Sequence, residues 1–430
     1  MKLRSRAACT LLAGVALCSL AFSSPAAAQQ TSEVEALRNQ VKELMSRIER
    51  LEKAPPPAAA SGSATGAPAP RTDVPLVAAD AFKAPQIVQS GNSKYKLTLT
   101  GWVNRMVVYA DDGVADDFMF TDNNGASSRF RLFGAAKLDD EWSAGTDIEL
   151  EAISANSRSS GLNTDSGAFS FNERKIEFYI ESKRLGRLTV GQGDTASNIT
   201  SEIDLSGTAN LGGYSDIGAT FGGIVMRNKT TGAAGGTINS LFSNLDGLHR
   251  EDRVRYDTPT FGGGFVASTS VTEGGGTDAV LRYNGKIGTA TVAGAIAYAN
   301  SDSRDLAGFD FNDQVNGSVS VRLENGFNAT FAAGTRDQKA GFDTQFYYGK
   351  LGYLTKLNSL GTTAFSIDYF TQDDFGVRTA NGDAYGAYVV QVIDALSTDL
   401  YAGVRNHEYS TRTTDYHDAI AIMTGARVRF

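Results

Sequence analysis

The chain has 430 residues, of which 41% are hydrophobic and 20% charged, and its formal net charge at pH 7 is −8. This acidic balance argues against a nucleic-acid partner, because nucleic-acid binding needs a basic surface. Nine prolines in 430 residues suit long, fully paired strands, because each proline removes a donor from the ladder.

Residues 1–28 have the pattern of a secretory signal peptide. Basic residues begin it, residues 11–22 form a short apolar run, and 25–28 offer an Ala-x-Ala cleavage site. The run is too short to span a membrane. Cleavage would remove three cations, taking the net charge from −8 to −11, and also both cysteines, Cys9 and Cys18. The secreted chain would then cross an oxidising compartment without disulfides.

Residues 29–53 are predicted to form a short α-helical coiled coil. Their apolar residues are spaced alternately by three and four, which is a heptad seam: Val34, Leu37, Val41, Leu44, Ile48 and Leu51. Valine and isoleucine at position a with leucine at d favour two strands, whereas residues 47–52 resemble a trimer-specifying pattern. A single amphipathic helix is the alternative. About three heptads are marginal alone, so we expect an already oligomeric body to support them.

Residues 54–93 are predicted to be a linker followed by an irregular segment. Pro55, Pro56 and Pro57 end the helix, and the stretch to about residue 71 is rich in proline, alanine, serine and glycine. Such a composition cannot bury a core. The remaining residues, 94–430, are predicted to form one domain.

From residue 94 onward we expect about 16 strands, with apolar and polar residues alternating along each. Residues 129–134 put Phe130 and Leu132 on one face and Arg129 and Arg131 on the other. Further strands are predicted at 95–102, 146–151, 175–181, 251–258, 264–272, 278–284, 289–299, 315–323, 327–335, 344–354, 362–371, 384–393, 398–408 and 418–430. No long apolar stretch follows the signal, which argues against a helical membrane protein.

The connections alternate between short turns and longer loops. Short turns are expected near 139–141, 183–186, 259–263, 285–288, 324–326, 355–361 and 394–397, and long loops near 110–127, 155–171, 194–250, 300–313, 336–343 and 372–383. This asymmetry is expected of a transmembrane antiparallel β-barrel. We therefore predict an all-β fold of this kind, preceded by the coiled coil.

The third loop, residues 194–250, is far longer than the others. Loops of this length are usually functional or disordered. It carries Glu202, Asp204 and Asp216, together with apolar stretches such as 221–226. The apolar residues predict a loop that folds inward onto the barrel wall; an external or adhesive loop is the alternative.

With these features the sequence resembles a Gram-negative trimeric porin, closest to the DcaP-like porins that carry an N-terminal coiled coil. Residues 128–134 resemble the second-strand motif of general porins, and 178–191 the strand pair that precedes the inserted loop. The resemblance covers residues 94–430. It implies that Arg129 and Arg131 line the wall and that Glu202 and Asp204 face them from the loop. The terminal Phe430 resembles the signal read by the barrel-assembly machinery.

Strand parity gives further candidates for the pore wall. Arginines that alternate with apolar residues should point inward, because a charge on the lipid face costs about 2–4 kcal/mol at mid-bilayer. With the resemblance, the predicted basic pore-lining residues are Arg129, Arg131, Arg187, Arg253, Arg255, Arg282 and Arg322. The predicted acidic residues of the constriction are Glu202, Asp204 and Asp216. The alternative is that the arginines only balance acids on neighbouring strands.

Enzyme functions find no support in the sequence. The three histidines, His249, His407 and His417, have no nucleophile motif or metal spacing beside them. We predict no catalytic residue, metal site or cofactor.

The predicted function is an outer-membrane porin that lets small hydrophilic solutes and ions diffuse passively. It is expected to be a homotrimer in outer-membrane lipid, with the coiled coil in the periplasm. The alternative is a structural or adhesive barrel, plugged by its third loop and joined to the peptidoglycan by the coiled coil. Neither the solute nor the sign of ion preference follows from the sequence.

Overall fold

A computed structural model describes residues 87–88, 91–92, 94–162, 169–301 and 311–430. The chain divides into two units, residues 1–66 and 67–430, and all described residues belong to the second. The predicted signal peptide, the coiled-coil seam and most of the linker lie outside the described residues.

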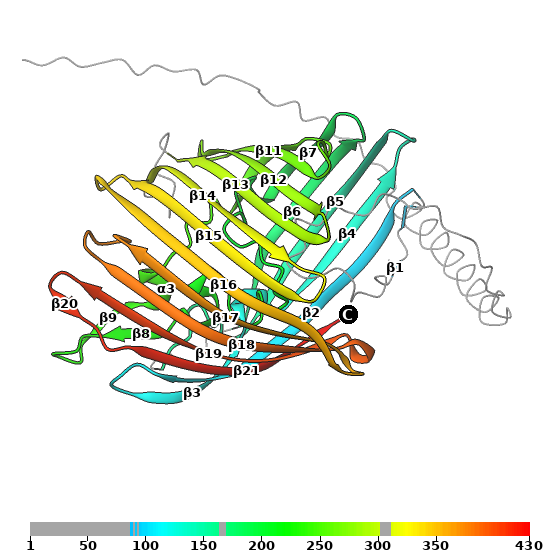
Figure 1. Cartoon of the computed structure of the whole chain (residues 1–430). Coiled ribbons are helices and arrows are strands. Elements are labelled where there is room, and N and C mark those ends of the chain that lie inside the picture. Colours follow the sequence, from blue (N-terminus) through cyan, green and yellow to red (C-terminus); the bar gives the residue numbers. More distant parts are fainter. Residues whose placement is uncertain (1–86, 89–90, 93, 163–168, 302–310) are drawn as a thin grey trace, which may run out of the picture. The chain divides into compact units, whose positions relative to one another are not determined.

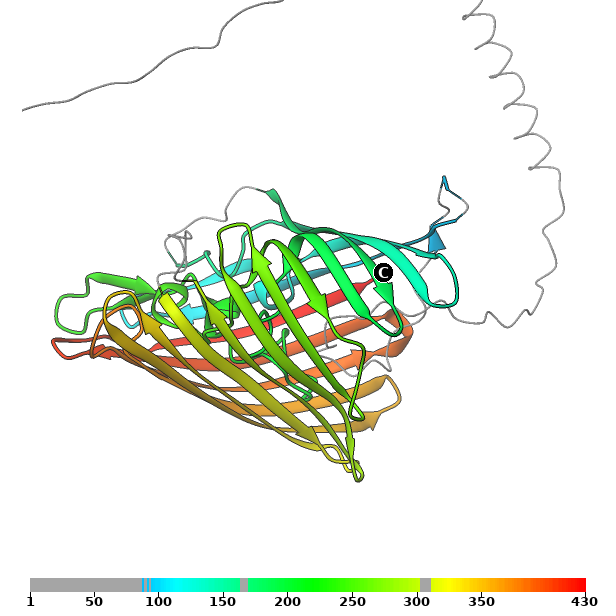
Figure 2. The same cartoon turned by 90° about the horizontal axis from the view of Figure 1, so that it is seen from above.

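The described chain is a 16-stranded antiparallel β-barrel (Figures 1 and 2). The long strands follow one another around the wall, and β21 pairs with β2 to close it. At the closure, the backbone N–H of Phe430 donates to the carbonyl of Gly101 at 3.0 Å, and Gly101 donates back at 3.0 Å. The strands are β2 (Lys96–Asp111), β4 (Arg129–Lys137), β5 (Trp142–Ile153), β6 (Ser170–Ser182), β7 (Gly186–Asp194), β10 (Arg250–Asp257), β11 (Phe265–Thr272), β12 (Thr277–Ile287), β13 (Ala290–Asn300), β14 (Phe311–Arg322), β15 (Phe327–Gln338), β16 (Phe342–Asn358), β17 (Gly361–Asp373), β18 (Asn381–Ile393), β19 (Thr398–Thr411) and β21 (Ala419–Arg429).

The wall strand after β2 is built in two parts. Residues 96–102 of β2 pair with β4, and residues 105–111 pair with β3 (Asp116–Asp122). Between them the chain turns inward through the short helix η2 (Asn124–Ala126). The sequence predicts a loop at residues 110–127, and β3 corrects this prediction. Its alternation, with Phe118 and Phe120 outward, is short and surrounded by aspartates that suggest a loop.

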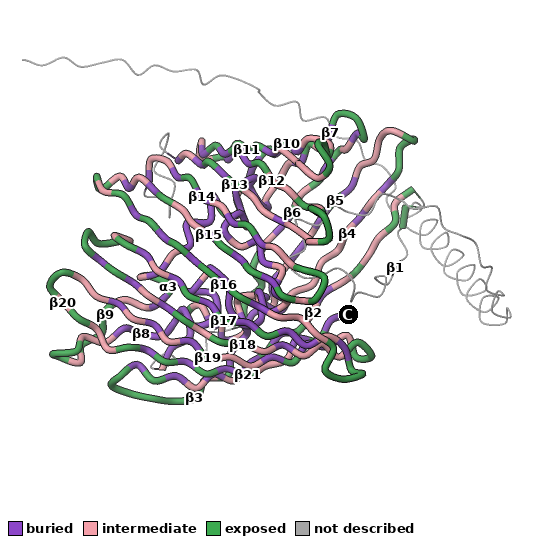
Figure 3. The backbone as a smooth tube through the Cα atoms, in the orientation of Figure 1, coloured by how far each residue is buried: buried purple, intermediate pink, exposed green. Residues whose placement is uncertain are grey.

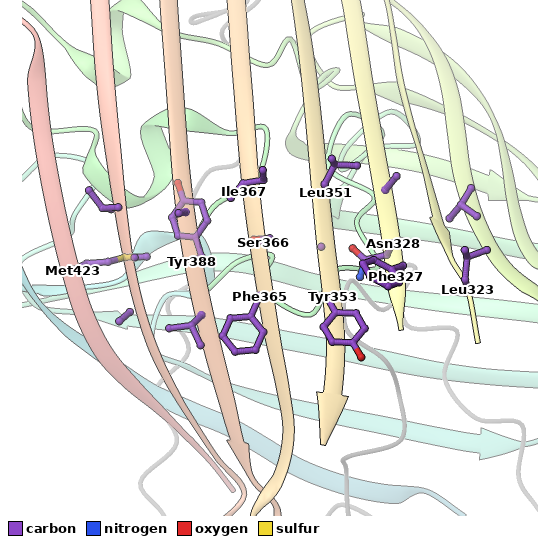
Figure 4. Close-up of a pocket in the computed structure, with 18 of the residues that line it drawn as sticks. Leu323, Phe327, Asn328, Leu351, Tyr353, Phe365, Ser366, Ile367, Tyr388 and Met423 are labelled. Atoms are coloured by element: carbon purple, nitrogen blue, oxygen red, sulfur yellow. The ribbon is translucent and has the colours of Figure 1, made fainter. Parts of the chain in front are cut away.

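Burial alternates along the strands, as expected of a wall with two different faces (Figure 3). On β21, Ile420 and Ile422 are exposed outward, while Ala421 and Met423 are buried inside. Outward side chains of β14–β21 surround a shallow hollow of 990 Å³, shown in Figure 4. Its lining is almost wholly apolar, including Leu351, Phe365 and Ile367. This outer surface suits contact with lipid chains.

Short turns gather at one end of the barrel, and the long loops lie at the other end together with some short turns. The long loop predicted near 336–343 is wrong, because β15 and β16 are joined there by a turn of three residues. The two-residue turn between β12 and β13 and the four-residue turn between β18 and β19 are at the first end, with the C-terminus. Three small elements complete the fold: β1 (Ile87–Val88), which pairs with β2, η3 (Asp394–Leu396) and β20 (Thr414–Asp415). No helix among the described residues is long and apolar enough to cross a membrane.

Candidate functional site: a loop inside the barrel

Most of the loop between β7 and β10 lies inside the barrel, along the inner wall. Its segment 228–236 is mostly exposed and lies beside β20 at the long-loop end, where the N–H of Lys229 donates to the carbonyl of Asp415 at 2.9 Å (Figure 1). The loop contains α2 (Ile217–Phe221), β8 (Val225–Arg227), β9 (Ala234–Thr237) and α3 (Ile238–Leu241). Its first part bonds to inward serines of β14. Backbone N–H groups of Ile203 and Leu205 donate to the hydroxyls of Ser318 and Ser320 at 3.0 and 2.9 Å. Because both pairs are two residues apart, the loop follows the wall as an extended strand would.

A buried ion pair fixes the loop to β16. Lys350 Nζ lies 2.7 Å from Asp204 Oδ2 and donates to the carbonyl of Gly213 at 2.6 Å. The two charged side chains are 0% and 2% exposed. Gly213 is needed for this approach, because a Cβ there would lie 2.3 Å from the ring of Tyr388. Asp204, predicted to face the passage, is instead an anchor of the loop.

The distal part of the loop packs against an apolar stretch of the inner wall. Phe242 contacts the rings of Phe370, His407 and Tyr409 at centroid distances of 6.1 Å. One buried cluster joins the loop to β2 and β15–β21. Its larger members are Met106, Leu211, Ile217, Phe221, Ile224, Met226, Ile238, Phe242, Leu245, Phe346, Tyr348, Phe370, Tyr388, Tyr401, Tyr409 and Met423. This side of the interior is therefore filled by packed side chains.

The opposite inner wall, on β4–β6, is charged. Arg129 Nη1 lies 2.8 Å from Glu149, and Arg131 pairs with Asp147. Arg174 lies 2.6 Å from Glu149 and also pairs with Glu151. These predicted wall residues, Arg129 and Arg131, thus point inward but are held by acids of β5.

Arg174 faces inward because of a register shift between β5 and β6. Glu149 pairs with Lys175 but Leu150 pairs with Glu173, so Arg174 is an extra residue. It therefore joins Lys175 on the inner face, as a β-bulge allows. A strict alternation of inward and outward residues does not predict that Arg174 faces the interior. Lys175 pairs with Asp194, which also lies 2.7 Å from Arg250.

The predicted arginines of β10 hold the base of the loop. Arg253 pairs with Glu177 at 2.5 Å and donates to the carbonyl of Asp194 at 3.0 Å. Arg255 pairs with Asp257 at 2.9 Å and donates to the carbonyl of Asp194 at 3.2 Å. The side chain of Arg253 is 2% exposed, whereas those of Arg131 and Arg250 are 23% and 28% exposed. The latter two are therefore better placed to meet solutes.

The other three predicted arginines have different positions. Arg187 on β7 lies 2.8 Å from Glu181, and its guanidinium lies over the ring of Tyr179 at 4.1 Å. Arg282 on β12 donates to the carbonyl of Asn198 at 2.8 Å, which holds the loop. Arg322 is half-buried at the end of β14 that leads into a short turn.

Acidic residues of the loop form a second charged group. Asp216 pairs with Arg158, which comes from the neighbouring loop, and their side chains are 17% and 35% exposed. Asp246 accepts hydrogen bonds from the N–H groups of Ile199 at 2.6 Å and Ser201 at 2.9 Å. Arg158 was not identified from the sequence, because it lies in a loop without alternation.

Burial shifts the titration of this acidic group. It raises the pKa of Asp246 to about 6, although two backbone N–H groups oppose the shift. It also raises the pKa of Glu202 well above its ordinary value, helped by the nearby charges of Asp246 and Asp216. Glu202 accepts one hydrogen bond, from Asn244 Nδ2 at 3.0 Å. The proton affinity of Glu202 therefore depends on the charges of Asp246 and Asp216 in the same loop.

The arrangement offers two charged arcs that remain partly in solvent. The wall arc contains Arg131, Arg174 and Arg250, and the loop arc contains Asp216 with Arg158. A barrel of this size is wide enough for an aqueous channel, and opposed charges in a channel bias which solutes pass. Among the described residues no group of three or more His, Cys, Asp or Glu could hold a metal ion.

Comparisons with known proteins agree with this architecture. Residues 55–412 match the model of the Gram-negative porin family. No curated protein sequence matches the chain. Many solved structures share the fold, and three of them illustrate the likeness at low identity. The anion-selective porin of Comamonas acidovorans is 14% identical, with a TM-score of 0.52, covering 78% of this chain and 100% of its own.

The other two are the outer-membrane protein OmpT of Vibrio cholerae and the outer-membrane channel DcaP of Acinetobacter baumannii. OmpT is 12% identical, with a TM-score of 0.52, covering 80% of this chain and 100% of its own. DcaP is 13% identical, with a TM-score of 0.51, covering 80% of this chain and 99% of its own. These likenesses concern the fold, whereas the family match spans most of the sequence. The chain belongs to the Gram-negative porin family, and is thus an outer-membrane channel protein rather than an enzyme.

Proposed function

We propose that the channel carries small hydrophilic solutes and ions by passive diffusion, and that the inserted loop sets its size limit. The observation that supports this most directly is the pair of charged arcs, whose side chains keep 17–35% exposure inside a closed barrel. Arg131, Arg174 and Arg250 would contact solutes from the wall, and Asp216 and Arg158 from the loops. No cofactor is needed for such diffusion.

We further propose a homotrimer in outer-membrane lipid, inserted by the barrel-assembly machinery through the strand that ends in Phe430. The predicted coiled coil would lie in the periplasm as an accessory to a trimer held by the barrels, with the peptidoglycan as a candidate contact. Removal of residues 29–71 should then leave a conducting trimer. A truncated chain found only as a monomer in mild detergent would instead give the coiled coil the leading role.

Single-channel conductance in a planar bilayer tests the channel itself. Insertion of the purified protein should give stepwise conductance that rises with salt concentration. A second candidate, a plugged structural barrel, has one observation in its favour: packed side chains fill the interior beside β15–β21. A folded, inserted protein without conductance would select this second candidate.

A further inference from the structure

The barrel closes at a seam between its first and last long strands. β2 and β21 pair from Trp102 with Arg429 to Asp111 with Ile420, so the partners are more than 300 residues apart in the sequence. Above the last of these pairs, at the long-loop end, three segments of the chain meet. They are the turn after β2, the loop before β21 and the β8–β9 hairpin of the inserted loop.

The β8–β9 hairpin is bonded to the loop before β21 through its backbone. The N–H of His417 donates to the carbonyl of Arg227 at 2.7 Å, and the N–H of Lys229 donates to the carbonyl of Asp415 at 2.9 Å. An isolated antiparallel bridge lies between these two bonds. Because β20 pairs with β19, the hairpin extends that small sheet at the mouth of the barrel (Figure 1).

The same hairpin is tied to the turn after β2 by an ion pair. Arg227 Nε lies 2.7 Å from Asp112 Oδ2, and the side chain of Asp112 is 1% exposed although the rest of the turn is exposed. Asp112 Oδ1 accepts hydrogen bonds from the N–H groups of Val114 and Ala115 at 3.1 and 2.9 Å. One buried carboxylate therefore shapes the turn and holds the hairpin at once. Without its cation it would be an uncompensated buried charge, which is costly.

Two glycines let the three segments approach one another closely. Gly113, in the turn after β2, has a φ of +80°, and a Cβ there would lie 2.3 Å from the Cβ of His417. A Cβ on Gly235 of β9 would lie 2.4 Å from the ring of Tyr416. The loop before β21 thus contacts the turn after β2 on one side and the hairpin on another.

We infer that the β8–β9 hairpin is a clasp, which holds the outer end of the β2–β21 seam closed and is itself held in place by the closed seam. Arg227 attaches it to the β2 side, and its backbone bonds attach it to the β21 side. Because the hairpin is fully seated only while both sides are together, fraying of the seam and departure of the hairpin should be one event. This holds whether or not the channel conducts.

Removal of one charge tests this coupling. Arg227→Gln leaves the carboxylate of Asp112 without its cation, so the hairpin should leave its position more often. Amide hydrogen exchange in the folded, detergent-solubilised protein should then rise about tenfold or more in residues 225–237 and by the same factor in residues 420–422 of β21. Residues 427–429, at the other end of the seam, should exchange as before.

Two variants separate the clasp from a general effect of charge. Lys229→Ala removes an exposed cation of the same hairpin, 3.7 Å from Asp418, and should leave exchange unchanged. Asp112→Asn/Arg227→Gln should bring exchange back towards the original rate, since no buried charge is left unpaired. Heat-modifiable migration shows that each barrel has folded. Equal exchange in Arg227→Gln and Lys229→Ala, or a rise confined to residues 225–237, would overturn the clasp.

Cross-linking gives a second measurement, because the chain without its signal would contain no cysteine. Asp112→Cys/Arg227→Cys removes the ion pair, so exchange at the outer end of the seam should be fast. A short bis-maleimide that joins the two cysteines should return the exchange to the original slow rate. Cross-linked protein that still exchanges fast at residues 420–422 would show that this contact does not hold the seam.

Discussion

The inner wall of this barrel has two sides of opposite character. On β4–β10 the inward residues are charged and paired, as in Arg129 with Glu149 and Arg253 with Glu177. On β15–β21 many are aromatic or aliphatic, as in Phe346 and Phe370, with fully buried ion pairs such as Arg405 with Asp368 between them. The inserted loop lies on the second side, and its apolar residues complete one buried cluster there.

This difference explains where a passage can run. Apolar side chains inside a water-filled barrel gain by being covered, so the apolar side selects the loop's position. The charged side is covered only in part, at the base of the loop on β10, and the guanidiniums of Arg131 and Arg250 keep contact with solvent. We therefore expect the loop to fill part of the interior and to leave a passage along the charged wall.

The largest expected effect comes from deleting the inserted loop. Deletion of residues 200–240 would expose the aromatic wall and enlarge the free interior, so single-channel conductance should rise and larger solutes should pass. Conductance in a planar bilayer and liposome swelling with sugars of graded size measure this. If intact trimers with the deletion conduct as before, the passage does not run beside the loop.

The next effect concerns the attachment of the loop. Lys350→Ala should leave Asp204 as an uncompensated buried charge, which costs about 3–5 kcal/mol. The loop should detach intermittently, seen as noisier open-channel current and faster proteolysis within residues 195–249. Lys350→Met/Asp204→Leu should restore quiet current, because an apolar pair can replace a buried ion pair.

Lys229→Ala provides the matched control in the same loop. Lys229 lies 3.7 Å from Asp418, and both side chains are about half exposed. Such surface pairs contribute about 0–1 kcal/mol. Current noise equal in Lys229→Ala and Lys350→Ala would show that the buried pair is not the anchor.

Alternation in the sequence predicted the wall well and the site only in part. The two-residue alternation along a strand is enough to predict which face of the wall carries Arg129, Arg131 and Phe430. The predicted strands from residue 251 onward match the observed ones closely. Arg174 was missed because a bulge breaks the period. Lys350 was missed because its role depends on Asp204, 146 residues away. Long-range pairing of this kind leaves no local signal.

Substitution of the arginines of the charged wall should change ion selectivity only where the side chain is exposed to solvent. Arg131→Gln and Arg250→Gln each remove a partly exposed cation, so the reversal potential in a salt gradient should shift towards cation preference. Arg253→Gln removes a cation that is 2% exposed, so folded channels should keep their selectivity. Its cost should appear in folding yield, because Glu177 and the base of the loop lose their partner.

The order of these shifts decides between two roles for the wall. Equal shifts in all three variants would mean that the whole arginine set senses the passage. No shift in any of them would mean that the wall charges serve only to balance one another.

The smallest effect is a pH dependence from the loop's acids. Asp246 has a pKa of about 6 in the folded protein, above the ordinary value of about 3.9. Between these values the folded state holds more protons than the unfolded state, so its contribution to stability is full at low pH and is lost as pH rises through about 6. The difference between these two pKa values corresponds to about 3 kcal/mol of folding stability at most.

Protonation of Asp246 and Glu202 also removes negative charge from the inserted loop. Lowering the pH from 8 to 5 should therefore shift the reversal potential modestly towards anions. Glu202→Gln keeps an oxygen for the bond from Asn244 while removing one titrating group, so its shift should be smaller. An identical shift in Glu202→Gln and the original protein would place the titrating groups elsewhere in the channel.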